Sequence, residues 1–346
     1  MRLIARLLLG AVLWALLAVS PAQVVVLSAQ ELWYQAYRAG VAAYQRGDWK
    51  LADEKLSLAL TKRPMEGRAI RVPGAFRLDY LPKYYLALVC LQQERYQQAL
   101  DLFEDVIRTR IVTERDPEFA ELQSSRDLAR RRNIDDFRER VVKIDALLAD
   151  GKEQTGTGIV VNGGTGTVDV ITALHVLVPK DDLARPAAPR SIRVAFFRGE
   201  GRPPAQAEWL GRFDVGLDLA AIRVKVSGDL VPRRAAWAYR DIRSVPIGPG
   251  EPVFTVGHAI EDWGASESNV VLSPIDDQES RRFVISAAGI AQRASGGPVI
   301  DNRGYLMGMM TALVPGGSRA AAVRVNEIVQ LLAVWRLDSG SRPVGP

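Results

Sequence analysis

The stretch ASGGPVIDNRGYLMGM, residues 294–309, sets a serine before two glycines and a proline and continues into short apolar segments. Glycine accepts backbone angles that other residues avoid, and proline restrains the chain, so Ser-Gly-Gly-Pro favours a tight turn that presents the hydroxyl of Ser295. The apolar segments on either side of Asp301-Asn302 are typical of two strands joined by a hairpin. This region is therefore predicted to be a strand pair entered through a serine-bearing turn.

Short β-branched segments separated by glycine, proline and aspartate extend this pattern back to Gly151. They include TGTGIVV, TVDVITAL, SIRVAFF, DLAAIRVKV, EPVFTVG and RFVIS. Many short strands without long helices between them favour an all-β barrel or sandwich. A helix is expected at residues 326–337, and residues 338–346 are expected to be a disordered tail.

Two more polar residues stand beside apolar strands of the same region. His175 directly follows VDVITAL, and Asp218 directly precedes LAAIRVKV. A carboxylate is costly to bury alone, whereas beside an imidazole it holds the correct tautomer and stabilises the imidazolium formed during proton transfer. Histidine, aspartate and serine therefore indicate nucleophilic hydrolysis. Asp214 is the alternative for the acid, but Asp218 stands directly before the apolar strand.

These segments together resemble the trypsin-like serine proteases, and in particular the disulfide-free bacterial HtrA-type branch. The resemblance rests on GTGIVV at residues 156–161, TALH at 172–175, DLAAIRV at 218–224 and SGGPV at 295–299 followed by GYLMGM. It implies two six-stranded antiparallel β-barrels with the site in the cleft between them. It also implies that Ser295 attacks the scissile carbonyl, that His175 transfers the proton and that Asp218 orients the imidazole.

The resemblance further implies an oxyanion hole made by the backbone N–H groups of Ser295 and Arg293. Members of the family ordinarily have Gly-Asn or Gly-Asp before the serine, whereas this chain has Arg293-Ala294. A forced left-handed backbone costs arginine about 1–2 kcal/mol, which leaves either a hole formed only on binding or none at all. Gly289 corresponds to the base of the specificity pocket, where the lack of an acid implies a preference for small or medium apolar side chains. His258 is expected to be structural.

Residues 31–150 show helical periodicity and contain two similar segments, at 36–64 and 80–107. Their small, aromatic and helix-ending residues resemble those of tetratricopeptide repeats, with an insertion at about residues 65–77. Helices are expected to continue over residues 117–150, with Arg130 to Arg132 on a solvated face. Such repeats stack around a concave groove, which implies docking of a protein partner. A plain helical bundle is the alternative.

The first 22 residues have the layout of a secretory signal, with Arg2 and Arg6 before an apolar run. Cleavage would leave the protein in the bacterial periplasm or outside the cell, whereas an uncleaved segment would tether it to the membrane. The single cysteine, Cys90, excludes an intrachain disulfide and is expected to be buried.

Composition limits the other partners. The net charge of +5 includes the two arginines of the expected signal, so no nucleic-acid partner is predicted. Only two histidines and one cysteine are present, so no metal site is predicted, and no cofactor is expected.

The sequence therefore predicts an α + β multidomain protein. Its expected parts are a signal peptide or signal anchor at 1–22, a tetratricopeptide-like helical domain at 31–150, a trypsin-fold protease domain at 153–337 and a tail at 338–346. The predicted function is an exported serine endopeptidase that acts on proteins or peptides, with the helical repeats docking a partner or substrate. The alternative is a catalytically impaired trypsin-fold protein that binds peptides as a scaffold.

Overall fold

The computed structural model describes residues 31–74, 77–164, 166–182, 185–233, 235–242, 246–257, 263, 265–274, 281–286, 294–313, 318–337 and 342–344. The predicted signal at 1–22 lies outside these ranges. The chain divides into two compact units, Met1–Pro82 and Lys83–Pro346. Within the described ranges, no helix combines the length and the apolar character needed to cross a bilayer.

The first unit contains a pair of helices and a two-stranded sheet. Helix α2 (Trp33–Gln45) packs on α3 (Trp49–Lys62). A β-carbon on Gly40 would lie 2.7 Å from Cγ of Leu56, so glycine permits the close approach of these helices. Strands β1 (Gly67–Arg71) and β2 (Arg77–Tyr80) are antiparallel; β1 lies within the predicted insertion at 65–77, and β2 begins at its last residue. The tetratricopeptide-like character of the helices stays a prediction.

Three more helices precede the barrels. They are α4 (Pro82–Gln92), α5 (Tyr96–Thr109) and α6 (Phe119–Arg138). Cys90 is fully buried in α4, and Arg131 and Arg132 are exposed on α6. The buried face of α5 carries Ala99, Leu100, Phe103 and Val106.

The helical prediction fails after α6, because residues 141–147 form strand β3 (Val141–Leu147). Val142, Ile144 and Ala146 are buried, while the alternate side chains Lys143 and Asp145 are partly exposed. This alternation has the period of a strand, and β3 pairs with β4 on one side and β6 on the other. Residues 141–147 therefore belong to the first barrel and not to the helices before it.

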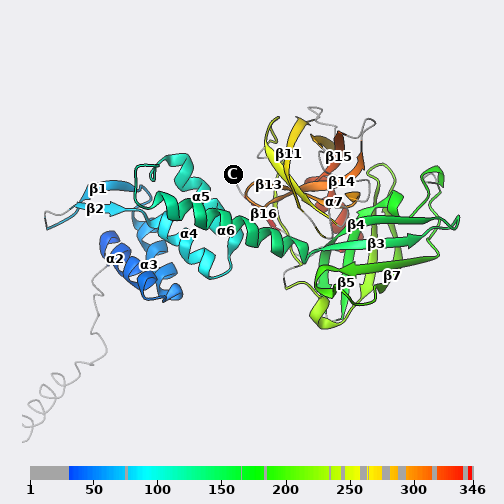
Figure 1. Ribbon diagram of the computed structural model, residues 1–346, viewed down its shortest axis with the longest axis horizontal. Coiled ribbons are helices and arrows are strands. Elements are labelled where there is room, and N and C mark those ends of the chain that lie inside the picture. The colour runs from blue at the N-terminus through cyan, green and yellow to red at the C-terminus, as the bar shows by residue number, and fades with distance from the viewer. Residues whose placement is uncertain are drawn as a thin grey trace, which may run out of the picture. The chain divides into compact units, whose positions relative to one another are not determined.

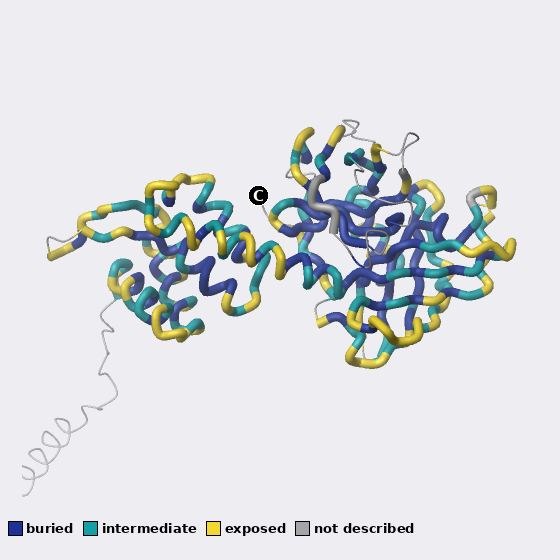
Figure 2. Tube along the Cα trace, viewed as in Figure 1, coloured by how far each residue is buried: buried dark blue, intermediate teal, exposed yellow. Residues whose placement is uncertain are grey.

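The first barrel is closed in the order β3-β4-β5-β8-β7-β6, and its neighbours are antiparallel. Its remaining strands are β4 (Glu153–Gly164), β5 (Thr167–Ala173), β6 (Ser191–Phe196), β7 (Ala205–Asp214) and β8 (Leu219–Lys225). Branched apolar side chains from these strands fill the interior. The tube in Figure 2 shows buried residues running through these strands.

The second barrel closes in the order β13-β10-β11-β12-β15-β14, because β13 also pairs with β14. Its strands are β10 (Pro252–Val256), β11 (Ala265–Pro274), β12 (Arg282–Ser286), β13 (Pro298–Asp301), β14 (Leu306–Leu313) and β15 (Arg319–Arg324). These strands are likewise antiparallel. The prediction of two six-stranded antiparallel barrels is confirmed (Figure 1).

Four short features complete the second barrel. The turn at Asp301-Asn302 joins β13 to β14, as predicted, and helix α7 (Val325–Trp335) begins one residue before the expected helical segment at 326–337 and ends inside it. Strand β9 (Ala238–Arg240) adds to the sheet beside β14. Strand β16 (Arg342–Val344), which falls in the tail expected to be disordered, pairs in parallel with β9.

Candidate active site

His175 lies in a short 3₁₀ turn, Leu174–Val176, that directly follows β5. Leu174 and Val176 are fully buried, and His175 itself is only 9% exposed. The two apolar neighbours anchor the turn in the barrel, so the imidazole is carried by a rigid scaffold. This is the placement that the sequence predicts for a histidine at the end of an apolar strand.

Asp218 contacts His175 through both carboxylate oxygens. The side-chain contact from Nδ1 of His175 to Oδ2 of Asp218 is 2.7 Å, and the backbone N–H of His175 donates to Oδ1 at 3.0 Å. The backbone N–H of Leu174 also donates to the Asp218 carbonyl, at 2.9 Å. These bonds fix the ring with Nδ1 toward the acid, which leaves Nε2 for proton transfer.

The backbone of Asp218 is left-handed, with φ of 60°. Aspartate tolerates this region better than most residues, and unusual backbone angles concentrate at functional sites. The other candidate acid, Asp214, instead accepts the N–H of Leu217 at 2.7 Å and so stabilises the turn before Asp218. The two carboxylates therefore have different partners, and Asp218 is the one beside the imidazole.

Ser295 lies in the loop that enters β13, and its side chain is largely covered, at 9% exposure for the residue. The turn is closed by the N–H of Gly297, which donates to the Ala294 carbonyl at 2.9 Å. It is also bonded to β14, because the N–H of Gly296 donates to the Met310 carbonyl at 2.7 Å. The predicted Ser-Gly-Gly turn is thus present and held on two sides.

Strand β4 connects this loop with the histidine turn. The N–H of Thr157 donates to the Ser295 carbonyl at 2.8 Å. A β-carbon on Gly156 would lie 2.5 Å from Cγ2 of Val176 and 3.2 Å from the Ser295 carbonyl oxygen. Gly156 therefore lies between the turn that carries His175 and the loop that carries Ser295, and only a residue without a side chain fits there.

Several predicted residues fall outside the described ranges. They are Arg293 of the oxyanion hole, Gly289 of the specificity pocket and His258. Two residues that the sequence did not single out, Thr157 and Thr172, lie at the junction of the barrels. Their positions within TGTG and TALH, beside the residues chosen for catalysis, were the signal that could have identified them.

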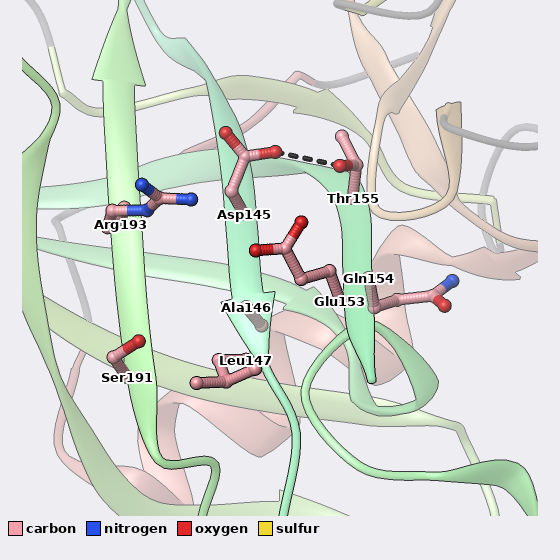
Figure 3. A pocket seen from close by; sticks show the side chains of 8 residues that line it. All are labelled: Asp145, Ala146, Leu147, Glu153, Gln154, Thr155, Ser191 and Arg193. Atoms are coloured by element: carbon pink, nitrogen blue, oxygen red, sulfur yellow. Dashed lines mark hydrogen bonds between the residues drawn. The ribbon is translucent and has the colours of Figure 1, made fainter. Parts of the chain in front are cut away.

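A pocket of about 410 Å³ also lies on the first barrel (Figure 3). It is lined by Asp145, Ala146, Leu147, Glu153, Gln154, Thr155, Ser191 and Arg193. Thr155 donates its hydroxyl to Asp145 at 2.7 Å, and Lys143 lies 3.3 Å from the same carboxylate. The Asp145 carboxylate therefore already has two partners in the protein. None of the residues that line the pocket was predicted to take part in the reaction. The described residues include no group of three or more His, Cys, Asp or Glu side chains placed to bind a metal ion.

Comparison with known proteins agrees with the barrels. Residues 156–309 match the family model of the trypsin-like peptidase domain. This part of the chain is therefore similar to a trypsin-like peptidase domain. Its matched region begins in β4 and ends in β14, and so includes His175, Asp218 and Ser295.

Solved structures similar to this chain include the Rv3671c protease from M. tuberculosis in its active form. That match has 23% identity and a TM-score of 0.44, and it covers 62% of this chain and 86% of the other. The inactive form of the Rv3671c protease matches with 20% identity and a TM-score of 0.42, over 63% of this chain and 96% of the other. No curated protein matches the chain.

Proposed function

We propose that the chain is a serine endopeptidase in which Ser295, His175 and Asp218 form the catalytic triad. The main support is the 2.7 Å contact between Nδ1 of His175 and the Asp218 carboxylate, in a region similar to the trypsin-like peptidase domain. An imidazole held in this way by a carboxylate is suited to accept a proton on Nε2 and to return it.

Each residue then has one role in peptide-bond hydrolysis. Oγ of Ser295 bonds to the scissile carbonyl carbon while Nε2 of His175 takes the hydroxyl proton. The C–N bond breaks as the imidazolium gives that proton to the leaving amine, and an acyl-enzyme remains. A water molecule then attacks the acyl carbon while Nε2 of His175 takes its proton. The imidazolium returns that proton to Oγ of Ser295 as the bond from Oγ to the acyl carbon breaks, and the carboxylic acid product leaves. Asp218 stabilises the imidazolium in both halves.

The negative oxygen of each tetrahedral intermediate needs hydrogen-bond donors. We assign the backbone N–H groups of Ser295 and Arg293 to this role. Loss of one such donor lowers turnover by about 10²–10³, so the direction of the Arg293 peptide determines how fast the enzyme is.

The test is labelling of the full chain with a fluorophosphonate probe, which bonds only to an activated serine. Wild-type protein should react at Ser295, identified by mass spectrometry of the labelled peptide, and Ser295→Ala should not react. An unreactive wild-type protein, or equal labelling of the variant, would overturn the proposal. An unreactive wild type that still binds peptides would support the second candidate, a peptide-binding protein without catalysis, which Arg293-Ala294 favours.

We propose further that the enzyme is exported to the bacterial periplasm or secreted, with residues 1–22 as signal or membrane tether. The helical region is proposed to dock a protein partner or to deliver substrate. The support is the layout of arginines and apolar residues in the first segment and the repeat-like spacing in the second. Fractionation of cells combined with N-terminal sequencing separates a cleaved from an anchored form, and recovery of the uncleaved chain in the cytoplasm would contradict export.

A further inference from the structure

The hydroxyl of Thr172 makes a buried hydrogen bond close to the candidate site. Thr172 lies on β5, three residues before His175, and donates from Oγ1 to the Thr157 carbonyl at 2.7 Å. Both threonines are fully buried. A buried carbonyl that loses its hydrogen-bond donor costs free energy, so this contact constrains the backbone of β4 at Thr157.

Thr157 carries the constraint to the second barrel. Its own N–H donates to the Ser295 carbonyl at 2.8 Å. One residue of β4 is therefore bonded on one side to the strand that leads into His175 and on the other side to the serine itself. Two consecutive hydrogen bonds thus link β5 to the serine loop, and the second of them joins the two barrels.

Gly296 leaves no spare room around this link. A β-carbon at Gly296 would lie 1.9 Å from the Thr157 carbonyl oxygen and 2.6 Å from Oγ1 of Thr172. The backbone of the residue after the serine thus packs directly against the Thr172–Thr157 hydrogen bond. A shift of the Thr157 carbonyl would push on Gly296 and move Ser295 with it.

We propose that Thr172 is a positioning residue that sets the placement of Ser295 relative to His175. The inference rests on the proposed function, because it concerns proton transfer between these two residues. A nucleophile and its base must lie within about 2.6–3.2 Å to share a proton, and an error of about 1 Å can lower a rate about 10²-fold. The hydroxyl of Thr172, which touches no substrate, acts through Thr157.

The decisive variant is Thr172→Val, which keeps the shape of the side chain but places a methyl group against the Thr157 carbonyl. We expect kcat to fall roughly 10–100-fold with KM nearly unchanged, because only the alignment of the reacting groups is disturbed. Thr172→Ser restores the hydroxyl and should remain within about threefold of wild type. If the valine variant does not fold, Thr172→Ala removes the hydroxyl with less disturbance of packing.

The chain offers a matched control in Thr255, a buried threonine on β10 whose Oγ1 has no hydrogen-bond partner among the described residues. Thr255→Val makes the same chemical change in a barrel strand without removing a hydrogen bond. It should leave kcat and KM unchanged. Equal losses in the two valine variants would mean that any buried threonine matters for packing, and would overturn the inference.

A second measurement needs no activity. Amide hydrogen exchange at Thr157 reports its bond to Ser295, and it should be faster in Thr172→Val than in wild type or Thr255→Val. Unchanged exchange together with unchanged fluorophosphonate labelling in Thr172→Val would overturn the inference while leaving the proposed function intact. A wild-type protein that never labels would overturn the proposed function, and the exchange comparison would still decide whether Thr172 holds the serine loop.

Discussion

The two barrels support their parts of the candidate site differently. The first barrel supplies His175 and Asp218 from the ends of its own strands, and these residues bond directly to each other at 2.7 Å. The loop with Ser295 belongs to the second barrel, yet the N–H of Thr157 from the first barrel holds its carbonyl. The first part is therefore fixed within its own barrel, and the second is held by its own barrel and also by a bond from outside it.

The same dependence is found at the hairpin that follows Ser295 and β13. Gln97 of α5 donates to the Gly304 carbonyl at 2.7 Å, and the hydroxyl of Tyr305 donates to Asp101 of the same helix. A β-carbon on Gly304 would lie 2.0 Å from Nδ2 of Asn133, so α6 packs directly on the turn. Helices α5 and α6 thus support the second barrel where the serine-bearing strand ends.

The largest expected effect comes from breaking the bonded pair of the first barrel. Asp218→Asn removes the charge that selects the tautomer of His175, so we expect kcat to fall by about 10⁴ while the fold remains. Peptide hydrolysis at saturating substrate measures the loss. Asp214→Asn is the matched control, because its amide oxygen can still accept the Leu217 N–H. Comparable losses in both variants would contradict the assignment of Asp218 as the orienting acid.

The next effect tests the external support of the serine loop. Gly296 has φ of 90°, and its β-carbon would lie 1.9 Å from the Thr157 carbonyl, so Gly296→Ala should lower the free energy of unfolding by roughly 2–5 kcal/mol. Gly201 has φ of 79° with no atom within 4 Å of its β-carbon position. Gly201→Ala should therefore cost only the backbone term, about 1–2 kcal/mol. Urea unfolding that finds equal losses would show that crowding against β4 is unimportant.

The sequence around His175 and Asp218 was sufficient to predict where these two residues lie on the first barrel. His175 and Asp218 each stand at the end of an apolar strand, and that position alone directs them to one end of the barrel. The serine turn was also predictable, since its glycines follow Ser295 directly. His175 and Asp218 meet because β5 and β8 pair antiparallel, with Ala173 opposite Leu219.

The features that were predicted wrongly or missed depend on contacts between residues that are far apart in the sequence. In VVKIDALL, residues 141–148, the apolar positions fit a helix through Val141, Ile144 and Leu148 as well as a strand through Val142, Ile144 and Ala146. Pairing with β4 and β6 decides between them, and a local pattern does not contain that pairing. The bonds from α5 to the 301–305 hairpin were missed for the same reason, because Gln97 lies 207 residues from Gly304.

A third prediction concerns Arg140, which lies between α6 and β3 and contacts the segment that leads into β9. Arg140 is 5% exposed, and its guanidinium lies 4.7 Å from the ring centre of Phe137 and 4.1 Å from that of Trp237. It also donates to the Ala236 carbonyl at 3.1 Å and pairs with Asp136 at 3.0 Å. Arg140→Met should cost about 2–3 kcal/mol in thermal or urea unfolding, because the acid and the carbonyl lose a buried donor.

The comparison for this variant is Arg202→Met, which removes the exposed ion pair with Asp229 and should cost less than about 1 kcal/mol. If Arg140→Met is as mild as Arg202→Met, the contacts of Arg140 with Phe137 and with the segment before β9 add little to stability. The support of the second barrel from outside would then be limited to the bonds at the 301–305 hairpin and the bond from Thr157.

The smallest effect is a pH dependence at the contact between α5 and the hairpin. Burial raises the pKa of Asp101 to about 6, against an ordinary value of 3.8, although the Tyr305 hydroxyl and Arg303 act in the opposite direction. Well below pH 3.8 the folded and unfolded chains both carry the proton. As the pH rises toward 6 the unfolded chain ionises first, so the contribution of Asp101 to stability falls across this window and stays low above it.

Asp101→Asn removes this titration while keeping an oxygen for Tyr305. The variant should lose part of the fall in stability between pH 4 and 6 and should exceed wild type above pH 6 by about 1–2 kcal/mol. Part of the pH dependence of stability will remain in this variant, because burial also raises the pKa of Asp301 to about 6. Asp229→Asn is the opposite control, since the hydrogen bond from Arg202 lowers the pKa of Asp229 and its contribution is lost as the pH falls. Parallel pH profiles for wild type and Asp101→Asn would show that the Asp101 contact does not titrate with folding, and the external support of the second barrel would then rest on the uncharged bonds at Gly304.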